Sequence, residues 1–138
     1  FSNLSKIDAR SMTVYLDACF SGDSPKGMIV RATSGISVTP RLPDATKQMV
    51  VITAARGDQY ASWDEEAEFG LFTRYLLEGL RGAADGEGYG NGDDQVTLAE
   101  VTAYLDDEMT YQARRRYARK QNVSVQGDPD TVLVTHQH

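Results

Sequence analysis

Residues 11–22 read SMTVYLDACFSG, a run of alternating character that ends in a turn. The apolar positions that would share one face of a strand are Met12, Val14, Leu16 and Ala18. Because side chains alternate along a strand, Asp17 and Cys19 project from the same face, about 7 Å apart along the chain. The stretch therefore predicts a strand that carries an acid and a thiol at its carboxyl end.

Two apolar patterns follow this strand. Residues 49–55 are apolar apart from Thr53, which is typical of a strand buried on both faces of a parallel sheet. Further along, an apolar stripe at helical spacing stops at Gly82 and consists of Phe69, Phe72, Leu76 and Leu80. A strand and then a helix are expected here.

The last third of the chain predicts a second helix and a short strand. Residues 97–100 read TLAE, a capping box, and open a helix that we expect to run to about Gln121. Its expected buried side consists of Leu98, Val101, Leu105 and Met109. Residues 130–134 predict a strand, residues 23–47 and 83–95 predict loops, and residues 135–138 predict a flexible tail. Residues 1–138 thus read as one α/β domain portion with few strands for its length.

Composition limits the class of protein. The chain has 138 residues, of which 41% are hydrophobic, enough for one domain with a core. We expect no membrane span, because no apolar run approaches the roughly 20 residues that a span needs. The N-terminus lacks the features of a secretory signal, and one cysteine excludes an internal disulfide, so a cytoplasmic location is expected.

Charge argues against a nucleic-acid partner. The net charge of −6 would repel a phosphate backbone. A basic run near the end of the second predicted helix could bind nucleic acid or lipid, but a solvated helix end is the favoured interpretation, since cations there face the helix dipole favourably. The run consists of Arg114, Arg115, Arg116, Arg119 and Lys120.

Cys19 has two interpretations from its position alone. Reactive groups gather beyond the carboxyl ends of parallel strands, which favours a functional thiol, but a free cysteine is often a small buried hydrophobe. A nucleophilic Cys19 needs an external base, because the neighbouring acid disfavours the thiolate. His136 and His138 lie at the end of the chain, where we expect them to be solvated rather than catalytic, and they are too few for a metal site.

Residues 15–22, YLDACFSG, resemble the Asp-Ala-Cys-x-Ser-Gly nucleophile motif of metacaspases and bacterial caspase-like cysteine peptidases. Residues 50–55, 69–80 and 96–100 resemble the following segments of that family in the same order. The resemblance implies a caspase-like (caspase-hemoglobinase) α/β fold, with a mostly parallel sheet and flanking helices. It also implies a Cys/His dyad in which Cys19 is the nucleophile and the histidine precedes Phe1. The N-terminal strands and that histidine would then belong to an N-terminal half of the same peptidase domain.

The same resemblance suggests residues that bind substrate. Asp17 matches the acid that helps form a pocket for Arg or Lys at P1, the residue before the scissile bond. Asp58 falls one position later than the second acid of the family pattern, where this chain has Gly57. Residues 60–64 resemble the Tyr-x-Ser-Trp-Arg segment of true caspases, and Asp64 in place of that arginine argues against aspartate at P1. Trp63 is thus a candidate substrate contact, with packing at a helix start as the alternative.

The Gly/Asp-rich residues 83–95 also suggest a calcium loop. Asn91, Asp93 and Glu100 fit three ligand positions of an EF-hand, but Tyr89 and Asp94 occupy the first ligand position and the invariant glycine position. We therefore expect no metal and no cofactor in this chain, and calcium activation elsewhere stays open.

The expected function is a cysteine endopeptidase that cleaves protein or peptide substrates after Arg or Lys. Such an enzyme could process itself in the loop at residues 23–47, with Arg31 and Arg41 as the favoured sites and Lys26 and Lys47 as further ones. Two alternatives remain open at this point. One is a catalytically inactive caspase-like interaction module, and the other is a redox-sensing thiol protein on a flavodoxin-like sheet.

Overall fold

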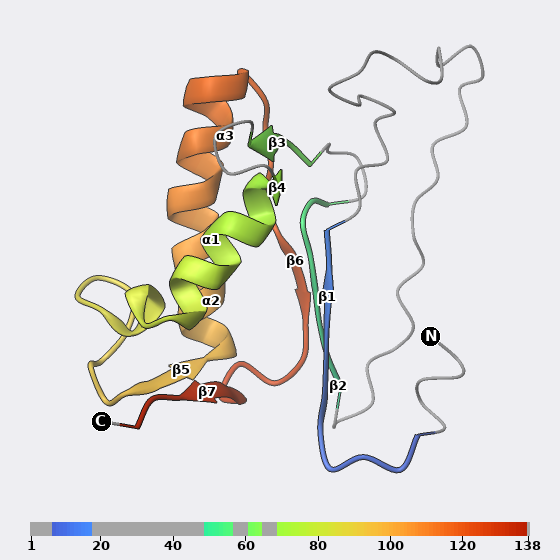
Figure 1. Cartoon of the computed structure of the whole chain (residues 1–138), viewed down its shortest axis with the longest axis vertical. Helices are drawn as coiled ribbons and strands as arrows, with labels where there is room; N and C mark the ends of the chain where they lie inside the picture. The colour runs from blue at the N-terminus through green and yellow to red at the C-terminus, as the bar shows by residue number, and fades with distance from the viewer. Residues whose placement is uncertain (1–6, 18–48, 57–60, 65–68, 138) are drawn as a thin grey trace.

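The computed structural model describes residues 7–17, 49–56, 61–64 and 69–137, and they form a mixed α/β structure. The helical segments are α1 (Leu71–Leu80), the 3₁₀ turn η2 (Ala83–Asp85), α2 (Leu98–Tyr104), the π-helical segment η3 (Leu105–Met109) and α3 (Thr110–Tyr117). The strands are β1 (Met12–Leu16), β2 (Met49–Thr53), β3 (Trp63–Asp64), β4 (Phe69–Gly70), β5 (Gln95–Thr97), β6 (Ser124–Gln126) and β7 (Val132–Thr135). Helices α1, α2 and α3 lie together on one side of β1, β2 and β6 (Figure 1).

The main sheet has the strand order β1-β2-β6. Strands β1 and β2 are parallel, from Met12 opposite Met49 to Leu16 opposite Thr53. Strand β6 is antiparallel to β2, so this sheet combines one parallel and one antiparallel pair in the part of the chain described. The sequence did not predict β6, because a strand of only three half-buried residues leaves almost no periodic pattern.

Burial along the first two strands agrees with their sequence patterns. In β1, Met12, Val14 and Leu16 are half-buried, while Thr13 and Tyr15 between them are exposed. In β2, the first four residues are all buried, as expected for a strand covered on both faces. Strand β1 pairs only with β2 among the described residues, and the backbone groups along its other edge face away from that sheet.

The first helix covers the predicted apolar stripe except for Phe69, which lies before the helix in β4. Phe72 and Leu76 are buried in the core, together with Leu71 and Tyr75 on the same face. Helix α1 ends at Leu80, and Gly82 follows with φ of 114°, a left-handed conformation that glycine adopts without strain. The predicted stop at Gly82 is confirmed.

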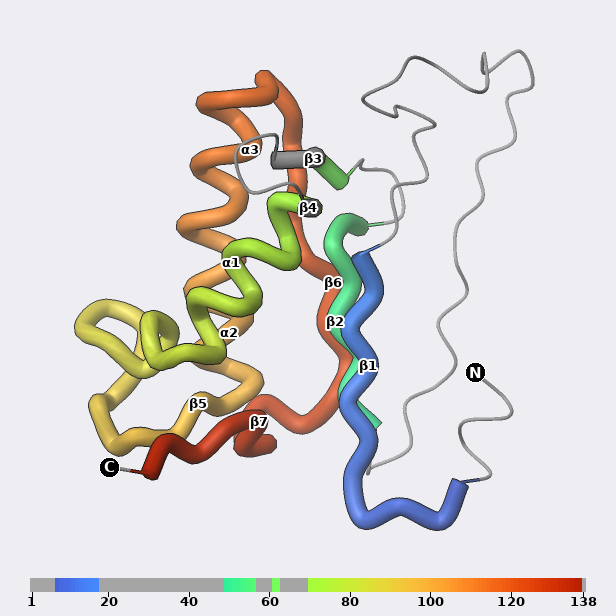
Figure 2. The backbone as a smooth tube through the Cα atoms, viewed as in Figure 1, coloured from blue at the N-terminus to red at the C-terminus, as the bar shows by residue number. Residues whose placement is uncertain are grey.

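The second predicted helix is one continuous helical run of α2, η3 and α3, as the backbone tube shows (Figure 2). It opens with the predicted capping box, in which the Thr97 hydroxyl accepts from the Glu100 N–H and the Glu100 carboxylate accepts from the Thr97 N–H. The predicted buried side is also confirmed, with Leu98, Val101, Leu105 and Met109 at most 1% exposed.

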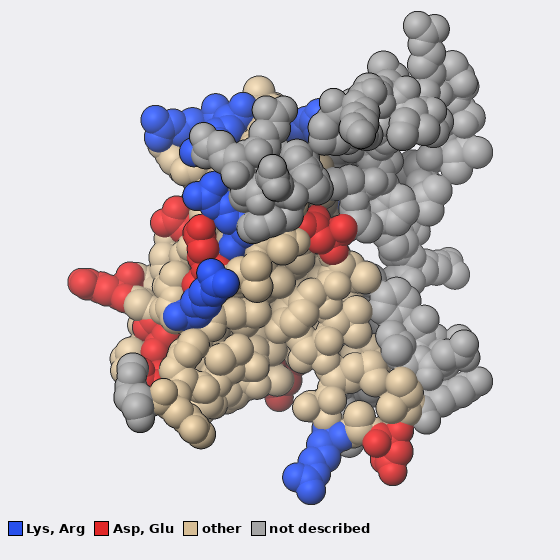
Figure 3. All heavy atoms as spheres, viewed as in Figure 1, with Lys and Arg blue, Asp and Glu red and all other residues tan. Residues whose placement is uncertain are grey.

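This helix ends at Tyr117, four residues before the expected end at Gln121. Ala118 adopts a left-handed conformation with φ of 49° and stops the helix, although no glycine marks the position. Arg114, Arg115 and Arg116 occupy the last turn, and Figure 3 shows Lys and Arg side chains gathered where α3 ends. This placement agrees with the interpretation of the basic run as a helix end.

The final strand is displaced from its predicted position. Strand β7 begins at Val132 rather than Asp130 and pairs antiparallel with β5, outside the main sheet.

Residues 83–95 are not wholly loop, since η2 and the first residue of β5 lie within them. At the end of the chain, Thr135 belongs to β7, and the His136 N–H donates to the Asp94 carbonyl oxygen at 2.8 Å. None of the described helices has the length and apolar character needed to cross a membrane.

Candidate functional site

The carboxyl ends of β1 and β2 meet at one edge of the main sheet. The two strands are parallel and in register, and the Ala54 N–H donates to the Leu16 carbonyl oxygen at 2.9 Å just beyond the last paired residues. The chain that follows each strand therefore leaves from the same edge, which is the usual place for reactive groups in such sheets. Cys19, Asp58 and the loop at residues 23–47 follow these ends and lie outside the described residues.

Asp17 is the predicted site residue whose side chain the structure places. It directly follows β1, is exposed, and points across the sheet edge toward the start of α1. The Thr73 hydroxyl donates a hydrogen bond to Asp17 Oδ2. The carboxylate also lies against the backbone of Gly70, the residue before α1. Asp17 is thus an accessible acid held at the N-terminus of a helix.

The backbone of Trp63 lies near Asp17. Residue Trp63 of β3 is paired with Gly70 of β4, and the backbone of Gly70 lies against the Asp17 carboxylate. The Leu71 N–H donates to the Ser62 carbonyl oxygen at 2.8 Å and continues this pairing into α1. The structure therefore brings the Trp63 backbone and Asp17 to the same helix end, while the Trp63 side chain lies outside the described part.

Gln121 fixes the segment between β2 and β3 to the core. It is fully buried, its Nε2 donates to the Ala54 carbonyl oxygen at 3.0 Å, and its Oε1 accepts from the Ser62 N–H at 2.8 Å. One side chain thereby holds both flanks of residues 55–61. Nearby, Arg56 Nε donates to the Val123 carbonyl oxygen at 3.3 Å. These hydrogen bonds hold the chain on both sides of the candidate residue Asp58.

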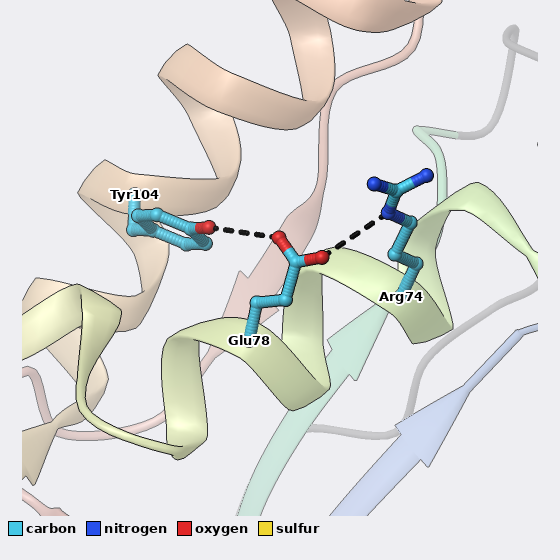
Figure 4. A network of polar contacts seen from close by, with 3 residues as sticks. All are labelled: Arg74, Glu78 and Tyr104. Carbon is cyan, nitrogen blue, oxygen red and sulfur yellow. Dashed lines mark hydrogen bonds and ion pairs between the residues drawn. The ribbon is translucent and has the colours of Figure 1, made fainter. Parts of the chain in front are cut away.

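A polar network joins α1 to α2 (Figure 4). Glu78 accepts from Arg74 Nε at 3.1 Å and from the Tyr104 hydroxyl at 3.3 Å. Burial raises the pKa of Tyr104 above its ordinary value, and the negative charge of Glu78 raises it further. Tyr104 fits against α1 because residue 79 is glycine, where a Cβ would lie 3.1 Å from the Tyr104 ring. The network is a structural contact that fixes the orientation of α1.

The Gly/Asp-rich loop is organised by a residue that the sequence reasoning did not single out. Asp85 is buried, and its carboxylate accepts from the N–H groups of Gly92 at 2.8 Å, Asp93 at 3.3 Å and Asp94 at 2.9 Å. The Asp93 carboxylate accepts from the Gln95 N–H at 3.0 Å. These carboxylates bind the backbone of the loop. Within the described residues, no group of three or more His, Cys, Asp or Glu side chains is placed to hold a metal ion.

His136 does not share an edge with Asp17. It directly follows β7, which lies at the opposite end of the molecule from the carboxyl ends of β1 and β2 (Figure 1). Its Nε2 is buried and has no hydrogen-bond partner within the described ranges. His138 is outside those ranges.

The structure adds three residues to the site that sequence reasoning missed: Gly70, Thr73 and Gln121. Thr73 lies 56 positions from Asp17 and Gln121 lies 59 positions from Ser62, so no local pattern relates them. Comparisons of the chain with protein-family models, with curated proteins and with solved structures find no match.

Proposed function

We propose that this chain carries the nucleophile and the substrate-binding acid of a caspase-like cysteine endopeptidase that cleaves after Arg or Lys. The observation that carries the proposal is the position of Asp17, an exposed carboxylate fixed at the carboxyl end of β1, two residues before Cys19. An exposed carboxylate attracts the cationic side chain of Arg or Lys. A carboxylate that is already held in place loses less conformational entropy when it binds that side chain. The nucleophile motif at residues 15–22 supplies the chemistry.

The proposed reaction is acyl transfer through Cys19. A histidine from the preceding part of the peptidase domain takes the thiol proton, and the Cys19 sulfur attacks the carbonyl carbon of the basic P1 residue. The Cys19 N–H and a glycine N–H from the preceding part stabilise the oxyanion. The histidine then gives its proton to the leaving amine, and water hydrolyses the thioester to release the acid and regenerate the thiol.

The outer edge of β1 supports an N-terminal half as the partner of this chain. Among the described residues β1 pairs with β2 alone, so the N–H and C=O groups of its other edge are available to a further strand. We propose that strands preceding Phe1 pair there and bring the histidine to the sheet edge that carries Asp17. No cofactor is proposed, and calcium activation is left to experiment.

The test uses the complete protein and fluorogenic peptides that differ only at P1, with Arg, Lys, Asp or Leu, measured with and without calcium. We expect cleavage after Arg and Lys that disappears in Cys19→Ala. We also expect Asp17→Asn to raise KM for both basic peptides by about tenfold or more, because the opposite charge is lost.

Three outcomes would replace the proposal. No cleavage of any peptide would favour an inactive caspase-like interaction module. Cleavage after Asp would contradict the role of Asp17. An oxidant-sensitive Cys19 without peptide cleavage would favour a redox-sensing thiol protein. Mass spectrometry of active enzyme tests self-processing, and an intact loop at residues 23–47 would exclude cleavage after Arg31 or Arg41.

A further inference from the structure

We propose that Thr73 is a positioning residue that sets the preference for basic residues at P1 by fixing the carboxylate of Asp17. This inference rests on the proposed function and names a specificity determinant within it. The Thr73 hydroxyl donates to Asp17 Oδ2, and this hydrogen bond joins the first turn of α1 to the end of β1. Thr73 is partly buried, whereas Asp17 is exposed. The hydrogen-bond donor is therefore partly shielded from solvent, and the carboxylate that would bind substrate is accessible.

Gly70 provides the space that this arrangement needs. A Cβ at residue 70 would overlap Asp17 Oδ2 and would lie 2.7 Å from Cγ and 2.8 Å from Oδ1. The backbone of Gly70 has φ of −59° and ψ of 143°, a conformation open to any residue. Glycine is therefore needed here for the close approach of the carboxylate and not for backbone conformation.

The charge of Asp17 also suits the helix end against which it lies. Residues 71–74, the first turn of α1, contain no acid, and Gly70 has no side chain that could cap the helix. Asp17 brings a negative charge from another element to the positive end of the helix dipole. Because Thr73 bonds Oδ2, the carboxylate is held in one orientation before substrate arrives.

A fixed carboxylate acts on binding more than on chemistry. If Asp17 rotated freely, part of the favourable interaction with a basic side chain would be offset by the entropy of ordering the acid. Loss of the Thr73 hydroxyl should therefore raise KM for Arg and Lys peptides and leave kcat nearly unchanged. A purely structural role in capping α1 would instead lower stability and reduce activity toward every peptide in parallel.

The test compares Thr73→Val and Thr73→Ser in the complete protein, with Thr102→Val as the matched control. Thr102 is also a partly buried helical threonine, and its hydroxyl donates to the Leu98 carbonyl oxygen at 2.7 Å. We expect Thr73→Val to raise KM for Arg and Lys peptides by about 3–10-fold, because substrate binding must then immobilise the Asp17 side chain. The value of kcat should stay within about twofold. Thr73→Ser should restore KM, and Thr102→Val should leave KM unchanged.

A second variant tests the same geometry without touching the hydroxyl. Gly70→Ala should displace Asp17 and raise KM for basic peptides by more than Thr73→Val does. Its control is Gly86→Ala, at a glycine with φ of −74° where a Cβ would lie 3.3 Å from the Ala83 carbonyl oxygen. The rate of Cys19 alkylation by iodoacetamide, measured in each variant, should stay constant, because the thiol itself is not changed.

The failure of this inference is distinguishable from the failure of the proposed function. If the unmodified protein cleaves Arg and Lys peptides and Cys19→Ala does not, unchanged KM in Thr73→Val overturns the role of Thr73 and leaves the proposed function in place. A loss of thermal stability in Thr73→Val together with a parallel loss of kcat toward every peptide, at unchanged KM for the basic peptides, also overturns it, in favour of a purely structural contact at the start of α1. An unmodified protein without peptidase activity overturns both.

Discussion

The side-chain oxygen of Gln121 accepts a hydrogen bond of 2.8 Å from the backbone N–H of Ser62, a residue 59 positions earlier in the chain. The same amide donates to the Ala54 carbonyl oxygen, so one buried side chain pairs two backbone groups of the segment after β2. The backbone carbonyl oxygen of Gln121 accepts a hydrogen bond of 2.8 Å from the Thr110 hydroxyl. Gln121 therefore links the sheet edge that carries the candidate site to the helical layer.

Replacing Gln121 should destabilise the protein. Gln121→Leu keeps a similar volume but leaves the Ser62 N–H and the Ala54 C=O buried without partners, and each such group costs about 1–3 kcal/mol. We expect a loss of about 2–4 kcal/mol in the free energy of unfolding, measured by chemical denaturation of the complete protein. Gln137→Leu, at an exposed position, is the control. Equal stability of the two variants would contradict the prediction.

The capping box of α2 should contribute measurably to stability. The Thr97 hydroxyl accepts from the Glu100 N–H at 3.3 Å, and the Glu100 carboxylate accepts from the Thr97 N–H at 2.8 Å. Removing the hydroxyl in Thr97→Ala leaves the Glu100 N–H without this partner, at a cost of about 1 kcal/mol. Denaturant titration against the exposed control Thr135→Ala measures the difference. If both variants lose the same free energy, the cap is not a stabilising contact.

Asp85 should hold the loop between η2 and β5 in its observed conformation. In Asp85→Ala the N–H groups of Gly92, Asp93 and Asp94 lose the Asp85 carboxylate. The Gly92 N–H keeps the Asp85 backbone carbonyl oxygen at 3.0 Å, and the Asp93 N–H keeps Asn91 Oδ1 at 3.0 Å. We therefore expect the largest effect at the Asp94 amide, which should exchange with deuterium at least about tenfold faster, since a hydrogen bond to a charged carboxylate is worth about 1.5–3 kcal/mol. Asp130→Ala is the control at an exposed position. Unchanged exchange at Asp94 would show that the loop is held by other contacts.

The stability of the protein should fall at alkaline pH in part through Tyr104. Burial, and then the charge of Glu78, raise the pKa of Tyr104 above the value of about 10 that an unfolded chain has. The folded state thus holds the proton more tightly, and the resulting stability is fully present below pH of about 10. It is lost as pH rises from there toward the folded pKa.

Tyr104→Phe removes this linkage, so its melting temperature should fall less steeply above pH of about 10 than that of the unmodified protein. Tyr111→Phe, at a tyrosine that is 53% exposed, is the matched control. Parallel slopes for all three proteins would rule out a contribution from Tyr104. The comparison uses slopes, because the Phe variant also loses the hydrogen bond to Glu78 and starts from a different stability.

Local pattern was sufficient for the elements with a strong periodic signal. The alternation in β1, the buried run of β2, the apolar face of α1, its stop at Gly82 and the capping box at Thr97 are all readable from neighbours in sequence. The expected helix end at Gln121 was wrong because Ala118, a residue with no turn signal, takes the left-handed conformation there. That early stop frees Gln121 to enter the core.

For the candidate site, the chain order supplied the residue types and the folded structure supplied their relations. The motif around Cys19 and the acid at Asp17 are adjacent in sequence, so the chemistry proposed for them needs no tertiary information. The folded structure alone places Asp17 between Thr73 and Gly70. It also lets Gln121 bond both Ala54 and Ser62. Both arrangements depend on interactions between segments more than fifty positions apart. Such interactions form only when the helices pack on the sheet, because hydrogen bonds across that distance require the whole core to bring their partners together.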